Sequence, residues 1–447
     1  NRTDLHVPVR ADVVAYFQER APDELDLPHP PPLDTRLTFS KTDISVASVP
    51  LNSPAGRSPA VAHLNWNNNV GIGQAAKVEG LEGLLVSDMR VGQFYNLAVD
   101  AKRNAVVTAK AFVANASHAE PTDLDNDGRQ DFLVADLGSF SPEDHSRGAV
   151  IWVRQHDNGQ FVGEPLINNL GRVSDVQVTD FNGDQLLDLV VAEFGWLKTG
   201  RILTFLNNGN VSAAGVPQFD EQVVDKRHGV IHVPVADLNS DGRSDFVALI
   251  SQEFETIVGF INRGDGTFEP QTILPPRDPS FGSSGIQLVD LDQDGDLDVL
   301  YTNGDLLDSF HVKPYHGIHW IENLRDGNWH SQELLAMPGV MRAIAGDLDG
   351  DTDLDIVACA FIPPQSLVED QQKERMATVA WLEQTAAGTF QPHALELGAP
   401  IHAALELGDF DRDGKLDIAV GNFQEDQDTA LTLWWNDTRE RQTSYQE

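Results

Sequence analysis

The chain has very little cysteine. Its 447 residues contain a single one, Cys359, so no disulfide can form within the chain. The same count excludes a CxxCH haem c site, a zinc ribbon and a CxxC redox centre. Cys359 stands in an apolar run at 356–360 and is predicted to be a small buried hydrophobic residue, not a nucleophile.

Basic residues and long apolar runs are also scarce. Lys and Arg number 31 against 69 Asp and Glu, which gives a formal net charge of −38. Nucleic acid is disfavoured as a partner because phosphate recognition needs clustered Lys and Arg, and anionic membranes are disfavoured for the same reason. No apolar run reaches the ~18 residues of a membrane span. The sequence also lacks a nucleophile elbow, a Walker loop, an HExxH motif and a Rossmann glycine pattern.

Aspartate is abundant, and it is concentrated in one nine-residue pattern that occurs six times. Each copy has an oxygen-bearing side chain at positions 1, 3, 5 and 9, and an apolar strand follows. The 24 side chains, of which 22 are Asp and two are Asn, are Asp123, Asp125, Asp127 and Asp131; Asp180, Asn182, Asp184 and Asp188; Asp237, Asn239, Asp241 and Asp245; Asp290, Asp292, Asp294 and Asp298; Asp347, Asp349, Asp351 and Asp355; and Asp409, Asp411, Asp413 and Asp417.

This spacing predicts about six calcium sites. Alternate positions of a curved loop point inward, and Ca²⁺ accepts 6–8 oxygens in a forgiving geometry. Glycine at position 6 permits the sharp turn. In the second and fifth copies the glycine moves to position 4, so those two loops are expected to curve slightly differently. Acidic surface turns without metal are the simpler alternative, and Mg²⁺ is disfavoured because it demands stricter geometry.

From residue 36 onward the sequence predicts an all-β fold. The loops begin 57, 57, 53, 57 and 62 residues apart, a spacing that fits one four-stranded sheet per repeat. An apolar strand A precedes each loop, strand B follows it, and strands C and D complete the unit. Repeated sheets of this size favour a β-propeller, whose radial packing leaves only short sheet edges. A β-solenoid is the alternative, but its repeats are usually shorter.

The D-x-D-x-D-G-x-x-D loop followed by an apolar strand resembles the FG-GAP/VCBS repeat family, which includes the propellers of integrin α subunits. The resemblance covers residues 115–437. It implies a propeller whose loops join strands A and B on one face and bind Ca²⁺, while ligands approach the opposite face. It implies no single activity, because the family includes adhesion modules, lectins and polysaccharide lyases.

Seven blades are predicted, one more than the loops mark. A further blade is expected upstream, with strands at 59–66, 83–88, 94–99 and 105–112 and an A–B connection at 67–73 that lacks the aspartates and binds no calcium. The last blade is one strand short, and residues 36–42 are expected to complete it by pairing with 431–435. The propeller thus spans 36–437, with blades starting near residues 59, 116, 173, 230, 285, 340 and 401.

Residues 1–35 are predicted to form a separate extension, and 438–447 a polar tail. The apolar spacing at 10–20 predicts a short amphipathic helix, and the prolines at 28 and 30–32 a stiff connector. The helix is expected to pack on the propeller; docking of another protein through residues 1–30 is the alternative. The chain opens at Asn1 without a signal peptide, which we interpret as a processed form.

Polar residues on strand A are candidate pocket residues, because strand A lines the channel of a propeller. The candidates, at or near the fifth position before each loop, are His63, His118, Asp175, His232, Arg342 and His402. They are expected to gather at the mouth opposite the calcium loops, beside the long B–C connections. They either bond backbone and water or form a site for an anionic or sugar-like ligand or for acid–base chemistry. A metal site built from His311, His316 and His319 is a further alternative.

Three functions are compatible with this pattern. The first is a secreted, extracellular or periplasmic propeller with structural Ca²⁺ that binds a protein or a carbohydrate, since such sites suit millimolar Ca²⁺. The second is a lyase-like enzyme acting on extracellular polysaccharide, with His118, His232 or His402 as base and Arg342 as the cation. The third is a subunit of a larger assembly, in which the acidic surface suits a basic partner such as a cytochrome.

Removal of calcium is predicted to lower the melting temperature. Extracellular-class sites bind at roughly 10⁻⁴–10⁻³ M, so millimolar Ca²⁺ contributes about 1.4 kcal/mol per site at the tighter end. Six such sites contribute roughly 8 kcal/mol, comparable with the stability of an ordinary domain. Thermal melts with Ca²⁺ and with EDTA measure this difference, and a melt that EDTA leaves unchanged would contradict it.

Overall fold

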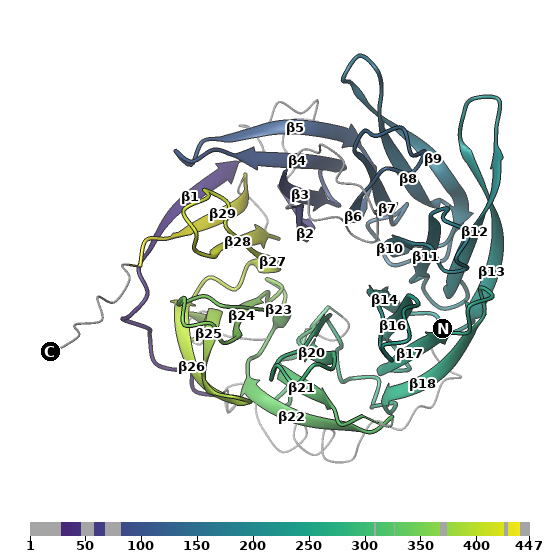
Figure 1. Ribbon diagram of the computed structural model, residues 1–447. Helices are drawn as coiled ribbons and strands as arrows, with labels where there is room; N and C mark the ends of the chain where they lie inside the picture. Colours follow the sequence, from purple (N-terminus) through teal and green to yellow (C-terminus); the bar gives the residue numbers. More distant parts are fainter. Residues whose placement is uncertain are drawn as a thin grey trace, which may run out of the picture.

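The computed structural model describes residues 28–45, 58–67, 82–307, 310–325, 327–366, 373–423 and 428–438. These residues form seven antiparallel sheets arranged in a ring around a central axis (Figure 1), which confirms the all-β, seven-bladed prediction. Within these ranges every named element is a strand, Lys373 alone has a helical assignment, and nothing there is a helix long and apolar enough to cross a bilayer. The predicted helix at 10–20, the connection after Asn67 and the end of the tail lie outside the described residues.

Each blade runs from strand A near the axis to strand D at the outer edge. In blades 1 to 4 the strands are β2 (Val61–Asn67), β3 (Gly83–Asp88), β4 (Gln93–Val99) and β5 (Ala105–Phe112); β6 (Ala116–Thr122), β7 (Asp131–Asp136), β8 (Gly148–Gln155) and β9 (Phe161–Leu170); β10 (Val173–Thr179), β11 (Asp188–Glu193), β12 (Arg201–Val211) and β13 (Pro217–Asp225); and β14 (Val230–His232) with β15 (Val235–Ala236), β16 (Asp245–Ile250), β17 (Thr256–Asn262) and β18 (Phe268–Leu274). In blades 5 to 7 they are β19 (Gly285–Val289), β20 (Asp298–Thr302), β21 (Gly317–Asn323) and β22 (Trp329–Ala336); β23 (Val340–Gly346), β24 (Asp355–Ala360), β25 (Ala377–Ala386) and β26 (Thr389–Leu397); and β27 (His402–Gly408), β28 (Asp417–Asn422), β29 (Thr429–Asn436) and β1 (Phe39–Ser45).

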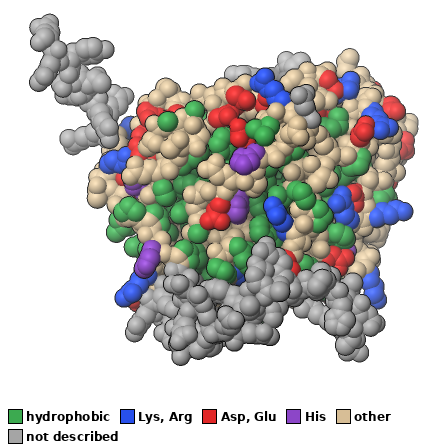
Figure 2. Space-filling view, turned by 90° about the horizontal axis from the view of Figure 1, so that it is seen from below, with side chains coloured by type: hydrophobic (Ala, Val, Ile, Leu, Met, Phe, Trp, Pro, Cys, Tyr) green, Lys and Arg blue, Asp and Glu red, His purple; other side chains and the backbone are tan. Residues whose placement is uncertain are grey.

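The place of a strand in its blade explains its sequence pattern. Strands B, such as β11 and β24, are buried along their whole length because neighbouring blades cover both faces, so they are short continuous apolar runs. Cys359 lies in β24 and is fully buried, as predicted. Outer strands such as β13 mix half-buried and exposed residues. Figure 2 shows the outer wall on the side of β22, where acidic, basic and hydrophobic side chains are interspersed.

The ring is closed by β1. It pairs antiparallel with β29, with Thr42 opposite Leu433 (Figure 1), and the Trp435 indole N–H donates to Thr42 Oγ1 at 2.9 Å. The strand begins at Phe39, three residues later than expected. The preceding connector first runs along β26, where the Ala394 N–H donates to the carbonyl of Pro32 at 2.8 Å. Seven blades therefore close without an open edge at the junction of the first and last blades.

A register shift near the start of strand A recurs in six of the seven described blades. The shifted pairs are Val61/His63, Ala116/His118, Val173/Asp175, Val230/His232, Val340/Arg342 and His402/Ala404. Such bulges redirect side chains and are frequent beside functional sites. In blade 4, Pro234 also divides the strand into β14 and β15, because proline cannot donate an N–H to the ladder.

Replacement of Thr42 by proline is predicted to destabilise the ring. The substitution removes a backbone donor from β1 and the hydroxyl that accepts from Trp435, so a loss of more than about 1 kcal/mol is expected. Thr42→Val is the matched control, since it removes only the hydroxyl. The melting temperature should fall further for T42P than for T42V, and equal melting temperatures for the two variants would contradict this role of β1.

Candidate functional site

The six acidic loops share one backbone conformation. In each, the carboxylate at position 1 accepts the N–H groups of positions 5 and 6, as Asp290 does from Asp294 and Gly295 at 2.9 Å. Position 6 has a φ between 69° and 96° in every copy, including Gln185 and Thr352. The different curvature expected for the second and fifth loops is therefore wrong: these two residues adopt the left-handed conformation that glycine takes elsewhere.

Carboxylate oxygens converge in four of the loops. In each, three aspartates place an oxygen within 4.8 Å of the other two. The groups are Asp123, Asp125 and Asp127; Asp290, Asp292 and Asp294; Asp347, Asp349 and Asp351; and Asp409, Asp411 and Asp417. The other two loops have an asparagine at position 3, so an amide oxygen stands where the four have a carboxylate.

The aspartates at position 9, called here the clamp aspartates, are bound by the blade itself. They are Asp131, Asp188, Asp245, Asp298, Asp355 and Asp417. In every copy Oδ1 accepts a backbone N–H from the end of strand C at 2.7–3.0 Å. In five copies Oδ2 accepts the N–H of loop position 2, as Asp245 does from Leu238 at 3.0 Å. These residues, predicted only as metal ligands, therefore also fix the loop to its own sheet.

The loops fit a hard divalent cation, because their inward side chains offer oxygen only. The fifth loop fits best. Asp349 Oδ1 is buried there without a hydrogen-bond partner, and no Lys or Arg of the described chain pairs with that loop's ligand positions. In other loops a guanidinium already supplies positive charge: Arg103 Nε lies 2.7 Å from Asp411 Oδ2, and Arg154 pairs with Asp125.

At the other end of strand A, the structure brings four of the six predicted pocket residues together. His118 Nε2 lies 2.8 Å from Glu120 Oε1 and 3.2 Å from Asp175 Oδ1. Asp175 Oδ2 lies 3.8 Å from His232 Nδ1. The ring of His63 lies 4.0 Å from that of His118, centroid to centroid. This axial network links blades 1 to 4.

Within the axial network, the surroundings favour the charged forms of His118 and Asp175. Burial opposes the charged form of His118, but Asp175 and Glu120 raise its pKa above the ordinary value. Burial likewise opposes the carboxylate of Asp175, yet His118 and His232 hold its pKa well below the usual range. Burial lowers the pKa of His63 and of His232, so both are neutral near pH 7.

A second polar row, which the sequence analysis missed, lies two residues further along strand A. Its members are Asn65, Glu120, Gln177, Gln287 and Glu406. Gln177 Nε2 donates to Glu120 Oε1 at 2.8 Å and to Asp175 Oδ1 at 3.2 Å. Burial raises the pKa of Glu406 to about 7. The signal was present in the sequence, because residues two apart on a strand share a face.

Arg342 and His402 occupy different surroundings. The Arg342 guanidinium donates to the carbonyl of Ile286 at 2.7 Å, and burial lowers its pKa against the opposing effect of Glu406. His402 lies outside the axial network: its Nε2 is 2.7 Å from Glu396 Oε2. The bulge between His402 and Ala404 places Ala404, not the histidine, at the position equivalent to Arg342.

The histidines after β20 are not grouped as metal ligands in the structure. His311, His316 and His319 belong to none of the potential metal-binding groups found among the described residues. Burial lowers the pKa of His319 to about 4, and its Nε2 lies 2.9 Å from Asn303 Oδ1.

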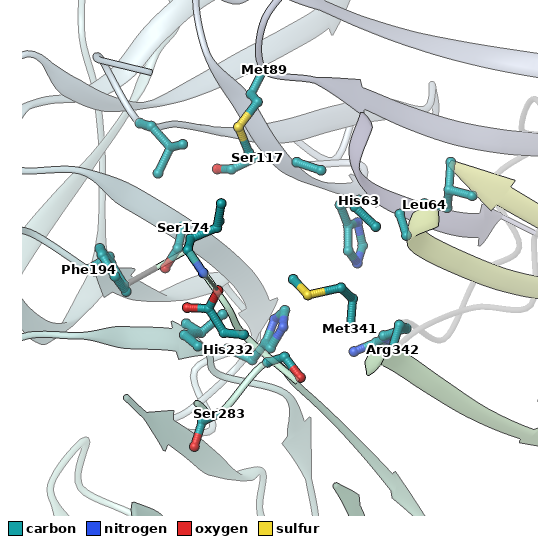
Figure 3. Close-up of a pocket in the computed structure, with 18 of the residues that line it drawn as sticks. His63, Leu64, Met89, Ser117, Ser174, Phe194, His232, Ser283, Met341 and Arg342 are labelled. Carbon is teal, nitrogen blue, oxygen red and sulfur yellow. Dashed lines mark hydrogen bonds between the residues drawn. The ribbon is translucent and has the colours of Figure 1, made fainter. Parts of the chain in front are cut away.

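The channel mouth contains two cavities that share part of their lining. The inner chamber, of about 240 Å³, is lined by His63, His232 and Arg342 (Figure 3). The outer chamber, of about 620 Å³, is lined by B–C connections from all seven blades. One residue from each connection, in blade order, is Arg90, Phe140, Trp196, Gln252, Leu307, Pro363 and Phe423. The B–C connections thus lie on the face opposite the acidic loops.

Six of the described residues that line the outer chamber are aromatic. They are Phe140, Phe194, Trp196, Phe310, Phe361 and Phe423. Phe423 packs against Phe361, with ring centroids 4.9 Å apart, and the Arg90 guanidinium lies 4.9 Å from the centroid of Phe423. The sequence placed these connections on the correct face, but it could not show which of their side chains turn inward.

A family model described as an FG-GAP-like repeat matches residues 123–191, 180–248 and 237–301. These ranges contain the first four acidic loops, and the seven-bladed ring supplies the architecture. The protein is a β-propeller that contains FG-GAP-like repeats. The fifth and sixth loops of this propeller lie beyond the matched ranges but have the same backbone conformation.

No curated protein matches the sequence. Among solved structures, the propeller is similar to a lectin of Agrocybe aegerita, described as recognising non-reducing terminal N-acetylglucosamine, with 17% identity and a TM-score of 0.45 over 80% of this chain and 89% of the lectin. It is also similar to a protein from Lactobacillus plantarum, with 13% identity and a TM-score of 0.44 over 80% and 88% of the two chains. At this level of similarity neither protein indicates what this propeller binds.

Replacement of Asp175 by asparagine is predicted to destabilise the propeller in a pH-dependent way. The folded pKa of Asp175 lies below the unfolded value of about 3.9. Its charge therefore stabilises the fold above that value, and the contribution is lost as the pH falls through the folded pKa. We expect D175N to cost about 3 kcal/mol at neutral pH, because the partners of a buried charge are left uncompensated.

Thermal melts of the wild type and of D175N between neutral and acidic pH measure this effect. The gap in melting temperature should be widest near neutrality and should narrow in acid. Asp157→Asn is the control, because its side chain is 92% exposed. A gap that is absent at neutral pH, or that widens in acid, would contradict the charge assignment.

Proposed function

We propose that this propeller is a ligand-binding module of a secreted, extracellular or periplasmic protein, stabilised by calcium. The observation that carries the proposal is the outer chamber, on which connections from all seven blades converge. Its volume of about 620 Å³ is in the range of small-molecule sites. A protein segment or a carbohydrate is also compatible with an opening at the mouth of a propeller.

Calcium has a structural role in this proposal. The acidic loops and the outer chamber lie at opposite ends of strand A, so a cation in a loop does not touch the ligand. Support comes from the oxygen-only donor sets and from the unpartnered Asp349 Oδ1. A location outside the cytoplasm follows from the millimolar Ca²⁺ that sites of this kind require.

A variant with a filled chamber tests the ligand site. Ala403 lines both chambers, and Ala403→Trp should obstruct them; Phe112→Trp, at a position 72% exposed on β5, is the matched control. A library of small organic compounds and oligosaccharides is screened for ligands that raise the melting temperature. Ligands should stabilise the wild type and F112W but not A403W. A library without ligands, or ligands that stabilise A403W equally, would overturn the proposal.

A lyase-like activity is the second candidate, favoured by one observation. The inner chamber places His232, which burial keeps neutral, in the same lining as Arg342. A neutral imidazole can accept the proton next to a uronate carboxylate, and a guanidinium can neutralise that carboxylate. Acidic polysaccharides should then yield an unsaturated, ultraviolet-absorbing product, which His232→Ala abolishes. Failure to form this product from any acidic polysaccharide would remove the candidate.

A further inference from the structure

Arg172 stands at the junction of the two chambers. It lies between β9 and β10 and contributes to the lining of both cavities. Its guanidinium carbon lies 5.1 Å from the centroid of the Phe194 ring. Its Nε is buried without a hydrogen-bond partner, and no carboxylate of the described chain forms an ion pair with it. The mouth therefore contains a positioned but unpaired positive charge.

Many other arginines of the described propeller form ion pairs, as expected in a chain with 69 acidic residues against 31 basic ones. Arg201 Nε lies 2.6 Å from Glu193, for example, and Arg227 lies 2.6 Å from Asp225. Burial lowers the pKa of Arg172 to about 10, and only Glu143 opposes this effect. Burying a charge without a partner costs free energy. An anion that arrives with the ligand would offset this cost.

The carboxylates that line the outer chamber are already engaged. Glu255 Oε2 accepts the N–H of Ser283 at 2.9 Å and its hydroxyl at 2.5 Å. Asp305 Oδ1 accepts the N–H of Leu307 at 2.8 Å. Neither forms an ion pair with Arg172, so the guanidinium is free to meet an acid group from outside.

The remaining lining is mostly apolar. The two chambers share Phe194, Met89, Ile231, Leu307 and Met341, and Figure 3 shows Met89, Met341 and Phe194 around the inner chamber. Among the described residues that line the outer chamber, the neutral polar side chains are Ser251, Gln252 and Gln365. A sugar carries several hydroxyls that lose their water on burial and need partners. An apolar body suits this lining better than a sugar ring.

We propose that the ligand is a small amphiphilic carboxylate, whose aromatic or branched aliphatic body fills the outer chamber and whose acid group bonds the Arg172 guanidinium. This inference rests on the proposed function and narrows it to one chemical class. The guanidinium offers two parallel N–H donors that match the two oxygens of a carboxylate. Contact with Phe194 limits the orientations that the guanidinium can take.

Calorimetric titration with three probes tests this inference. The probes are naphthylacetate, the nearly isosteric neutral naphthylacetamide, and glucuronate, an acid without an apolar body. The wild type should bind naphthylacetate about tenfold or more tightly than either of the other probes. The amide lacks the charge-assisted bidentate contact, and glucuronate lacks the burial of an apolar body. A403W should bind none of them.

Variants at Arg172 test whether the preference for the acid over the amide comes from the guanidinium. Arg172→Met should abolish the preference for the acid over the amide, and Arg172→Lys should retain only part of it, because an ammonium lacks the planar fork. Unchanged binding of the amide shows that each variant is folded. Arg263→Gln, at an exposed arginine paired with Glu269, is the control and should behave as the wild type.

Several results would overturn the inference. Equal binding of acid and amide by the wild type, or an acid preference that survives in R172M, would remove Arg172 as the anion site. Tighter binding of glucuronate would replace the amphiphilic class by an acidic sugar. In each case, loss of binding in A403W would still support the outer chamber as the ligand site. No binding of any probe overturns the inference, whereas the proposed function is overturned by a library without ligands or by ligands that stabilise A403W equally.

Discussion

The architecture depends on one buried contact repeated in six blades: the clamp aspartate that joins the acidic loop to the end of strand C. In three of these blades, the strand C residue whose N–H the clamp accepts also donates a side-chain hydrogen bond to the preceding blade. Asn262 Nδ2 donates to the carbonyl of Phe181 at 2.8 Å, and Asn436 Nδ2 to that of Leu348 at 2.9 Å. In every copy a single carboxylate thus joins its loop to the end of strand C, and in those three blades the same residue pair also contacts the neighbouring blade. This coupling explains why loops of different composition have one backbone conformation.

The same contact has an electrostatic cost that a bound cation would reduce. Burial raises the pKa of Asp131, Asp355 and Asp417 to about 7, and neighbouring loop carboxylates add to the rise. Arginines such as Arg103 reduce this repulsion in some loops, but the fifth has no such partner within the described residues. The acidic loops lie at one end of strand A, whereas the other end opens into a mouth lined mostly by apolar side chains. The acidic loops at one face can therefore stabilise the ring, while the B–C connections at the opposite face are free to vary in sequence for binding.

The sequence predicted most of the fold, because the loop pattern marks the junction of strands A and B and so sets the register of every blade. The closing strand was predicted because the last blade lacked a fourth strand. It begins three residues later than predicted, because Pro32 and Asp34 first form hydrogen bonds with β26. The site was predicted less completely. Period-two alternation could have identified Glu120 and Glu406, but no pattern shows the bulge that removes His402 from the channel face. Arg172 could not be found from sequence, since its significance is the absence of a partner, which depends on tertiary packing.

The most direct test of the account is to locate the cations. Crystals grown in Ca²⁺ and measured at a wavelength where calcium scatters anomalously would show whether the loops hold metal. The account predicts an anomalous peak among the side chains of positions 1, 3 and 5 in all six loops, with the highest occupancy in the fifth, from Asp347 to Asp355. Six well-ordered loops without a peak, their carboxylates paired only with protein and water, would contradict it.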